Sequence, residues 1–217
     1  MIFTLFSNPI LFLLLAVSIV VAITVHEFAH AKMAEYLGDP TASLQGRVTL
    51  NPMAHLDLYG TIFLLLVGFG WGKPVQFDPF NLDNPRRDGA LISFAGPASN
   101  FIIAILCAIL AQLFIFLGIS ALTTIGLLIL SPMIMMNVML GVFNLLPVHP
   151  LDGFKIVGGI LSEDHAREWY QLERYGMLFL LMLIIPFGGQ SMLHSILDPI
   201  LGFLYGILLP SSISTFI

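Results

Sequence analysis

An uncharged apolar run extends from Ile10 to Val25, and similar runs recur along the rest of the chain. Of the 217 residues, 58% are hydrophobic and only 10% are charged, whereas charged residues make up about 25% of a typical soluble domain. A helix of about 20 apolar residues is long enough to cross the hydrocarbon core of a bilayer. The sequence therefore predicts an all-α polytopic membrane protein with little chain left for a soluble domain.

The apolar segments predict about five to six transmembrane helices. The first span begins at Pro9, which suits the first turn of a helix, and ends at Leu37 before the helix-stopping Gly38-Asp39-Pro40. Later spans are predicted at Gly89–Leu117, Ala121–Leu146, Tyr175–Phe187 and Met192–Leu209, with a short helix at Phe154–Leu161 and an exposed charged segment at Ser162–Arg174. This pattern divides the chain into a membrane core over residues 1–160 and C-terminal helical membrane segments over residues 161–217.

Between the first and second core spans, the sequence predicts a short membrane-associated β-strand and re-entrant region. Leu44–Leu50 is typical of a short strand that ends at Asn51-Pro52. Tyr59–Trp71 is apolar but too short to span a membrane, which favours a re-entrant or interfacial segment. Gly72–Phe77 is a candidate for a second short strand.

The positively charged residues predict the orientation of the chain. Residues 1–31 and the turn at 118–124 contain no Lys or Arg. The cations lie in or beside two other loops: Lys32, Arg47, Lys73, Arg86 and Arg87 belong to the first, and Lys155, Arg167 and Arg174 to the second. By the positive-inside rule both loops face the cytoplasm, which places the end of the first span near that side.

Composition also limits the partners of the chain. The formal net charge of −5 and the lack of a basic patch exclude a nucleic-acid partner, whereas the lipid bilayer is an expected one. Cys107 is the single cysteine, so disulfides and cysteine-based zinc sites are excluded as well.

The first apolar run leads directly into His26-Glu27-Phe28-Ala29-His30, which has the pattern HExxH. Histidines four residues apart share one helix face, so their imidazoles can bind one tetrahedral Zn²⁺. Glu27 can then act as the general base for an attacking water. Ionisable groups at bilayer depth cost about 2.5–3.5 kcal/mol each on insertion scales, so a polar cluster there usually has a function.

Two other interpretations of this motif are weaker. The first is a solvated helix end that happens to carry two histidines and a glutamate. The second is a signal peptide cleaved after Ala29-His30-Ala31, but residues 1–25 contain no Lys or Arg for its positive start.

A catalytic zinc needs three protein ligands and one open position. Glu35, nine residues after His26, points to the opposite side of the helix. His55 and Asp57 are nearer in sequence, and Asp152 lies just past the third span on the same predicted side of the membrane. An isolated Asp-Gly pair such as Asp152-Gly153 is most often a turn, so the residues alone leave the third ligand open.

The segment from Asn144 to Gly153, read NLLPVHPLDG, resembles the second signature of the site-2 proteases, the intramembrane zinc metalloproteases of peptidase family M50. Further segments are similar to the family: Phe94–Asn100 matches GPxxN, Trp71–Val75 matches a WGKPV-like motif, and Asn51–Gly60 matches NPxxHxDPxG with Leu58 where proline is usual. The resemblance covers roughly residues 10–160, which would form the catalytic core of a minimal member without a PDZ or CBS domain.

The resemblance implies specific roles for residues of this chain. His26, His30 and Asp152 would ligate Zn²⁺, and Glu27 would activate water. Asn100 and Asn144 would lie near the active site, where amide donors can orient a substrate or stabilise an oxyanion, although hydrogen bonds between helices are an alternative. His55 is either an additional donor or a loop-capping residue, and His149 occupies a variable position of the motif.

These features predict a zinc-dependent intramembrane endopeptidase in a multi-pass cell-membrane protein, with its active site toward the cytoplasm. Its substrates would be membrane-anchored proteins cut within or near their transmembrane segments, held by edge pairing with the strand at Leu44–Leu50. The alternative is a zinc-binding transporter or a noncatalytic membrane scaffold. Only the enzyme requires a general base, so Glu27 distinguishes the two.

Overall fold

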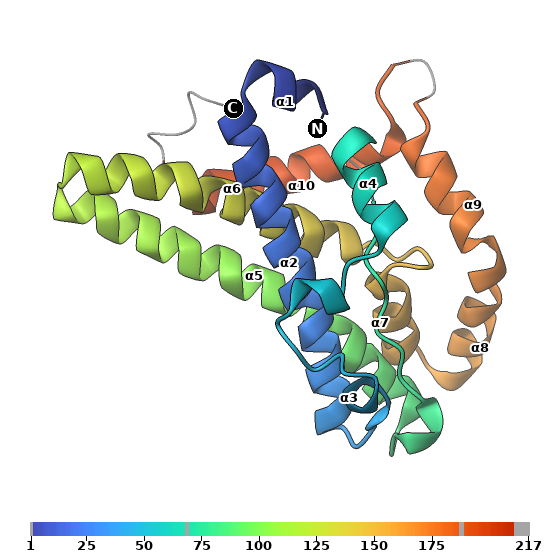
Figure 1. Cartoon of the computed structure of the whole chain (residues 1–217). Coiled ribbons are helices and arrows are strands. Elements are labelled where there is room, and N and C mark those ends of the chain that lie inside the picture. The colour runs from blue at the N-terminus through green and yellow to red at the C-terminus, as the bar shows by residue number, and fades with distance from the viewer. Residues whose placement is uncertain (1, 68–69, 187–188, 211–217) are drawn as a thin grey trace.

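The computed structural model describes residues 2–67, 70–186 and 189–210, and helices make up most of this part of the chain (Figure 1). Three of the helices are long and apolar enough to cross a membrane: α2 (Pro9–Tyr36), α5 (Pro85–Leu117) and α6 (Ser120–Asn144). They match the first three predicted spans to within about one turn. A mostly helical membrane protein is therefore confirmed by the length and composition of these helices.

The remaining helices are shorter. They are α1 (Ile2–Ser7), α3 (Thr41–Leu44), α4 (Leu58–Val67), α7 (Asp152–Ile160), α8 (Glu163–Gln171), α9 (Glu173–Ile184) and α10 (Met192–Leu208), with 3-10 turns η1 (Pro52–Ala54) and η2 (Pro79–Asn81). Two further spans were predicted where α9 and α10 lie, but these helices have 12 and 17 residues, fewer than the roughly 20 of a typical membrane-spanning helix. The prediction of five to six spans is thus unsupported, since the described residues hold three candidates. Phe187, the predicted end of one span, lies outside the described residues.

The strand predicted at Leu44–Leu50 is wrong. This segment contains the end of α3 and a turn through Gly46, whose φ of 68° is left-handed. The Arg47 amide donates to the Ala42 carbonyl oxygen at 2.9 Å, and the Arg47 side chain is 4% exposed. The Arg47 amide, which would hydrogen-bond to a neighbouring strand in a sheet, therefore closes the end of α3 instead.

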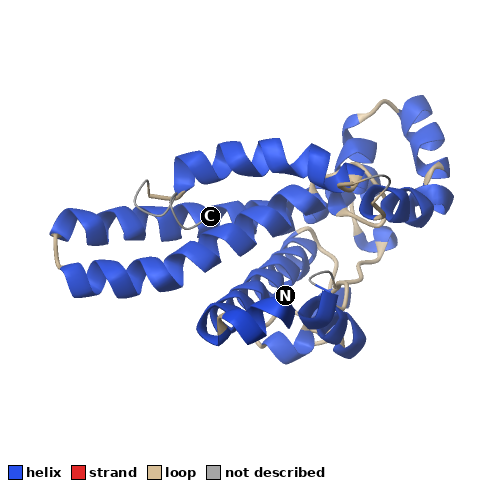
Figure 2. Ribbon diagram, turned by 90° about the horizontal axis from the view of Figure 1, so that it is seen from above, coloured by secondary structure: helices blue, strands red, loops and turns tan. Residues whose placement is uncertain are grey.

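The predicted re-entrant segment and second strand also differ from the structure. Most of Tyr59–Trp71 belongs to α4, which lies beside α2 (Figure 1), although its Gly68 falls outside the described residues. Gly72 forms only an isolated antiparallel bridge with Leu56, followed by a bond from the Lys73 amide to the His55 carbonyl oxygen at 2.7 Å. Pro74 has no amide hydrogen, so the ladder cannot continue through it. Figure 2 accordingly draws helices and loops throughout the described residues.

The ends of the long helices follow from local chemistry. Asn8 caps α2 by accepting a hydrogen bond from the Leu11 amide at 3.1 Å, and Pro9 occupies the first turn. α5 begins at Pro85, one turn before the predicted start, and the Asp88 carboxylate accepts from the Asn84 amide at 2.7 Å. Gly118 ends α5 in the left-handed conformation, with φ 68°.

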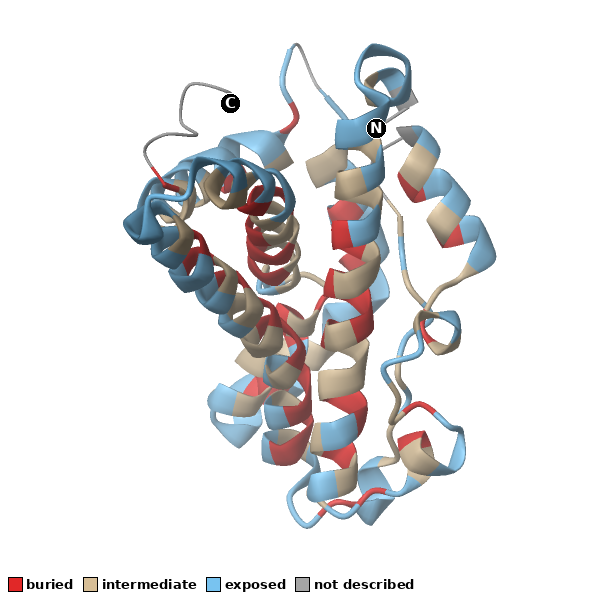
Figure 3. Cartoon of the chain, turned by 60° about the vertical axis from the view of Figure 1, so that its left-hand side comes forward, coloured by how far each residue is buried: buried red, intermediate tan, exposed pale blue. Residues whose placement is uncertain are grey.

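α5 and α6 form an antiparallel pair that extends away from α2 (Figures 1 and 2), and α10 packs against α6. Small side chains of α5 allow this close packing. The shared core consists of Ala104, Ala108, Ile134, Val138, Val142 and Leu197. Buried residues follow the facing sides of α2, α5 and α6 (Figure 3), and the functional site lies where these three helices meet.

Candidate metal centre

Three potential metal ligands converge between α2 and the start of α7. His26 and His30 lie one turn apart on α2, and Asp152 is the first residue of α7. The His26 Nε2 atom lies 3.0 Å from Asp152 Oδ2, the His30 Nε2 atom lies 3.3 Å from the same oxygen, and the two Nε2 atoms are 3.0 Å apart. The ligand atoms all lie within 4.8 Å of one another, as donors to a single cation must.

The other nitrogen of each imidazole identifies its tautomer. His30 Nδ1 lies 2.7 Å from the Ile92 carbonyl oxygen, which can only accept, so Nδ1 carries the hydrogen. His26 Nδ1 lies 2.7 Å from Asn100 Oδ1 and donates in the same way. Both Nε2 atoms therefore direct lone pairs at each other and at a carboxylate oxygen. Three acceptors at this spacing repel one another unless a cation or a proton lies between them.

The neighbouring helix is shaped to accommodate this cluster. A Cβ atom built on Gly96 of α5 would lie 2.4 Å from His30 Nε2 and 2.7 Å from His26 Cε1. Only glycine therefore permits α5 to approach both imidazoles. Two neutral imidazole nitrogens and one carboxylate oxygen match the protein donor set of a catalytic Zn²⁺.

When a proton rather than a metal lies between these groups, it favours the charged form of Asp152. Burial raises the pKa of this carboxyl, but the charges and hydrogen bonds of protonated His30 and His26 lower it well below the ordinary value of an aspartic acid.

Glu27 faces a different set of partners from the two histidines. Its Oε2 atom accepts a hydrogen bond from the Val75 amide at 3.1 Å and lies 3.9 Å from Arg47 Nη2. The buried Arg47 guanidinium also donates to the carbonyl oxygens of Ala54 and Lys73. The loop around Gly72–Val75 thus covers Glu27, and Arg47 connects that loop to the one before α4.

The candidate residues left open by the sequence now have defined positions. Glu35 pairs with Lys32 at 2.7 Å, and Asp57 accepts from the Gly60 amide at 2.8 Å in the first turn of α4. The fully buried His55 contacts the Thr49 carbonyl oxygen at 2.7 Å within its own loop. His149 lies edge-on to the Phe154 ring and 3.7 Å from Glu173. Asp152, rather than any of these, joins the histidine pair.

The two predicted asparagines differ in their relation to this cluster. Asn100 contacts His26 directly, and its Nδ2 atom donates to the Ala22 carbonyl oxygen at 3.0 Å and to Asn137 Oδ1 at 2.9 Å. Both of its amide hydrogens are therefore used within the protein. Asn144 instead donates to the Leu140 carbonyl oxygen of its own helix at 3.0 Å.

Roles at the site for Asn137 and Arg47 were not predicted from the sequence. The signal for Asn137 is a polar residue within an apolar span, two turns before Asn144 and on the same helix face. The signal for Arg47 is weaker, because a cation in a loop is ordinarily exposed. Its burial depends on carbonyl groups of residues distant in sequence.

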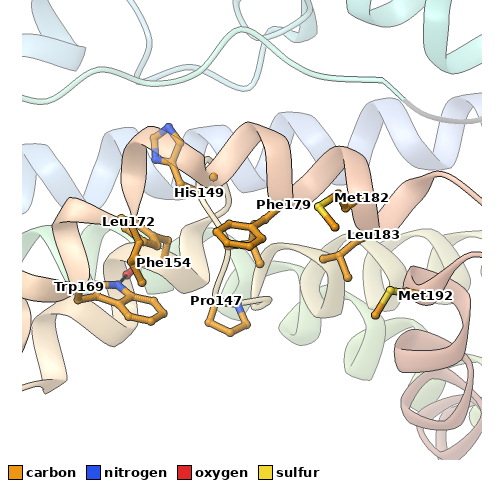
Figure 4. Close-up of a pocket in the computed structure, with 11 residues that line it drawn as sticks. Pro147, His149, Phe154, Trp169, Leu172, Phe179, Met182, Leu183 and Met192 are labelled. Atoms are coloured by element: carbon orange, nitrogen blue, oxygen red, sulfur yellow. Dashed lines mark hydrogen bonds between the residues drawn. The ribbon is translucent and has the colours of Figure 1, made fainter.

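An apolar pocket of about 320 Å³ is lined in part by the loop that leads to Asp152 (Figure 4). Pro147 and His149 form one wall, and Phe179 and Met182 of α9 form another. The pocket shares this loop with the cluster but is lined by none of the three ligand side chains.

A family model described as peptidase family M50 matches residues 14–125 and 117–187, which together cover most of the chain. The chain belongs to peptidase family M50. This confirms the resemblance to the site-2 proteases that the motifs indicated.

Individual relatives agree with this assignment. The chain is 39% identical over 179 residues to "Putative zinc metalloprotease YwhC" of Bacillus subtilis. These aligned residues are 81% of this chain and 82% of that protein. The chain is 30% identical over 172 residues to "Putative zinc metalloprotease Rip2" of Mycobacterium tuberculosis, covering 76% of this chain and 64% of that protein. "Zinc metalloprotease MJ0392" of Methanocaldococcus jannaschii is 27% identical over 161 residues, which are 74% of this chain and 38% of that protein. No solved structure matches the chain.

Proposed function

We propose that this M50 protein is a zinc-dependent intramembrane endopeptidase of the HExxH type. The observation that carries the proposal is the convergence of three lone-pair donors, His26 Nε2, His30 Nε2 and Asp152 Oδ2, within 4.8 Å. The names of the relatives, all zinc metalloproteases, support zinc as the cation and peptide hydrolysis as the reaction.

Each side chain of the centre has a role in the proposed reaction. Zn²⁺, when bound, supplies a Lewis acid that polarises the scissile carbonyl and lowers the pKa of water beside it. Glu27 accepts a proton from the attacking water and delivers it to the leaving amine. The Val75 amide and Arg47 hold the Glu27 carboxylate in place. Asn100 positions His26, while a contribution of Asn144 to substrate or oxyanion binding stays a prediction.

We further propose that the site acts within a multi-pass cell-membrane protein and faces the cytoplasm. Three apolar helices of sufficient length support the membrane location, and each carries part of the site: His26 and His30 on α2, Asn100 on α5 and Asn137 on α6. The concentration of Lys and Arg between the end of α2 and the start of α5, and from α7 to α9, supports the orientation. The proposed substrates are membrane-anchored proteins, cut within or near their transmembrane segments.

The Glu27→Gln variant tests the enzymatic part of this proposal. Gln retains the shape of the side chain but cannot act as a base, so zinc should be retained while cleavage of a transmembrane model substrate falls by at least a hundredfold, within the range expected for losing general-base catalysis. Glu35→Gln, at a partly exposed position on the same helix, is the matched control and should cleave normally. A transporter or scaffold would not require Glu27. Cleavage by purified Glu27→Gln at the wild-type rate would refute the proposal.

A further inference from the structure

A chain of buried amide groups connects α6 to His26. Asn137 Nδ2 donates to the Met133 carbonyl oxygen at 2.8 Å, and Asn137 Oδ1 accepts from Asn100 Nδ2 at 2.9 Å. Asn100 Oδ1 then lies 2.7 Å from His26 Nδ1. Asn100 and Asn137 are both 0% exposed, so water does not compete for these groups.

The direction of each hydrogen bond between these amide groups follows from the last acceptor, the Met133 carbonyl oxygen. The Met133 carbonyl oxygen can only accept, which turns the amide nitrogen of Asn137 toward it and the oxygen toward Asn100. That oxygen selects the nitrogen of Asn100, leaving the Asn100 oxygen for His26. His26 must then carry its hydrogen on Nδ1 and present a bare Nε2 to Asp152 and His30.

We propose that Asn137 is a positioning residue that, through Asn100, holds His26 in the tautomer able to bind the metal. The inference rests on the proposed zinc function of the site. If the Asn100 amide turned over, its nitrogen would face His26 Nδ1 and favour a hydrogen on Nε2, which would remove the lone pair. The Ala22 carbonyl oxygen also holds the Asn100 nitrogen, so loss of Asn137 weakens the arrangement without abolishing it.

A purely structural role for Asn137 has a different consequence. A hydrogen bond between helices stabilises the fold, and its loss changes thermal stability without a specific effect on the metal. Partners that orient a metal-binding histidine typically change metal affinity by about 10–100-fold when they are mutated. Zinc affinity measured on folded protein therefore separates the two roles.

The test is competition for zinc between a chelator and the purified, detergent-solubilised full chain. Asn137→Leu removes both polar atoms while keeping the branched shape of the side chain, and it should weaken zinc binding by about 10–100-fold. Asn137→Asp keeps an oxygen that accepts from Asn100 and should bind zinc close to the wild-type level. Ser131→Ala is the matched control, because Ser131 is also buried on α6 and bonds to the Leu127 carbonyl oxygen at 2.6 Å. Its zinc affinity should not change.

Wild-type zinc affinity in folded Asn137→Leu would overturn the inference while leaving the proposed zinc function intact. If Asn137→Leu does not fold, Asn137→Asp decides: near-wild-type affinity supports the inference, and a loss of more than about tenfold in the folded protein overturns it. A wild-type chain that binds no zinc would instead contradict the proposed function on which the inference depends.

Discussion

Arg47 Nη2 lies 3.9 Å from Glu27 Oε2, although the two residues belong to different elements and Arg47 is almost completely buried. Burial lowers the pKa of Arg47, and the nearby charge of Glu27 opposes that effect. A buried guanidinium that donates to two backbone carbonyl oxygens holds both loops around the general base.

Replacing this residue by Arg47→Met should reduce peptide cleavage without removing zinc. Each hydrogen bond from a charged donor contributes about 1.5–3 kcal/mol, so the covering loop should become less ordered and turnover should fall by at least tenfold. The effect should appear in kcat more than in zinc content, measured on the same preparation. Arg87→Met, at an exposed position, is the control. Unchanged kcat in Arg47→Met would mean that the loops are held by other contacts.

Gly96→Ala tests how closely α5 must approach the two histidines. The added Cβ atom would lie 2.4 Å from His30 Nε2, so the helix or the imidazole must move. We expect the variant to lose most of its zinc, as measured by elemental analysis of the purified protein. Gly202→Ala is the control, since its Cβ would meet no atom within 4 Å. Full zinc occupancy in Gly96→Ala would show that the site tolerates this displacement.

Asp39 should make the fold sensitive to acid. Burial raises the pKa of its carboxyl, but hydrogen bonds from Thr41, Asn81 and the Asp78 amide lower it by more than burial raises it. The pKa of Asp39 is therefore below its ordinary value. Because the pKa of the folded state is the lower one, this stabilisation is present above the unfolded value of about 3.9 and is lost as the pH falls through the folded value.

Asp39→Asn should therefore destabilise the protein by about 1–3 kcal/mol at pH 7, and less as the pH falls below about 4. Thermal unfolding of the solubilised chain between pH 3 and 7 measures this difference. The control is Asp83→Asn, in the short segment between η2 and α5, where the side chain is exposed. A difference between Asp39→Asn and wild type that stays constant with pH would contradict the linkage.

The long helices could be predicted because their signals are local. Pro9 and the apolar run after it define the start of α2, and Gly118 defines the end of α5. The two C-terminal helices lie close to where they were predicted, but their assignment as membrane spans is unsupported, because apolar composition alone does not show that helices of 12 and 17 residues cross a bilayer. The sequence of Leu44–Leu50 favours a short strand that ends at Asn51-Pro52, but hydrogen bonds from the Arg47 side chain to the Ala54 and Lys73 carbonyl oxygens override that local preference.

The residues of the site also divide into those that local sequence predicts and those that depend on tertiary contacts. Spacing on one helix is sufficient to pair His26 with His30, whereas the third donor required the family motif around Asp152. The supporting residues depend on tertiary contacts: Asn137 acts across two helices, and Arg47 reaches carbonyl groups far along the chain. No pattern within a single segment contains that information.

The most direct test of the metal centre is the zinc content of purified wild-type protein compared with Asp152→Ala. His26, His30 and Asp152 supply all the protein ligands of the proposed site, so the wild type should carry equimolar zinc. Asp152→Ala leaves only two ligands and should lose the metal on dialysis against a weak chelator. A wild-type chain without zinc, or an Asp152→Ala variant that keeps the full amount, would contradict the proposed centre.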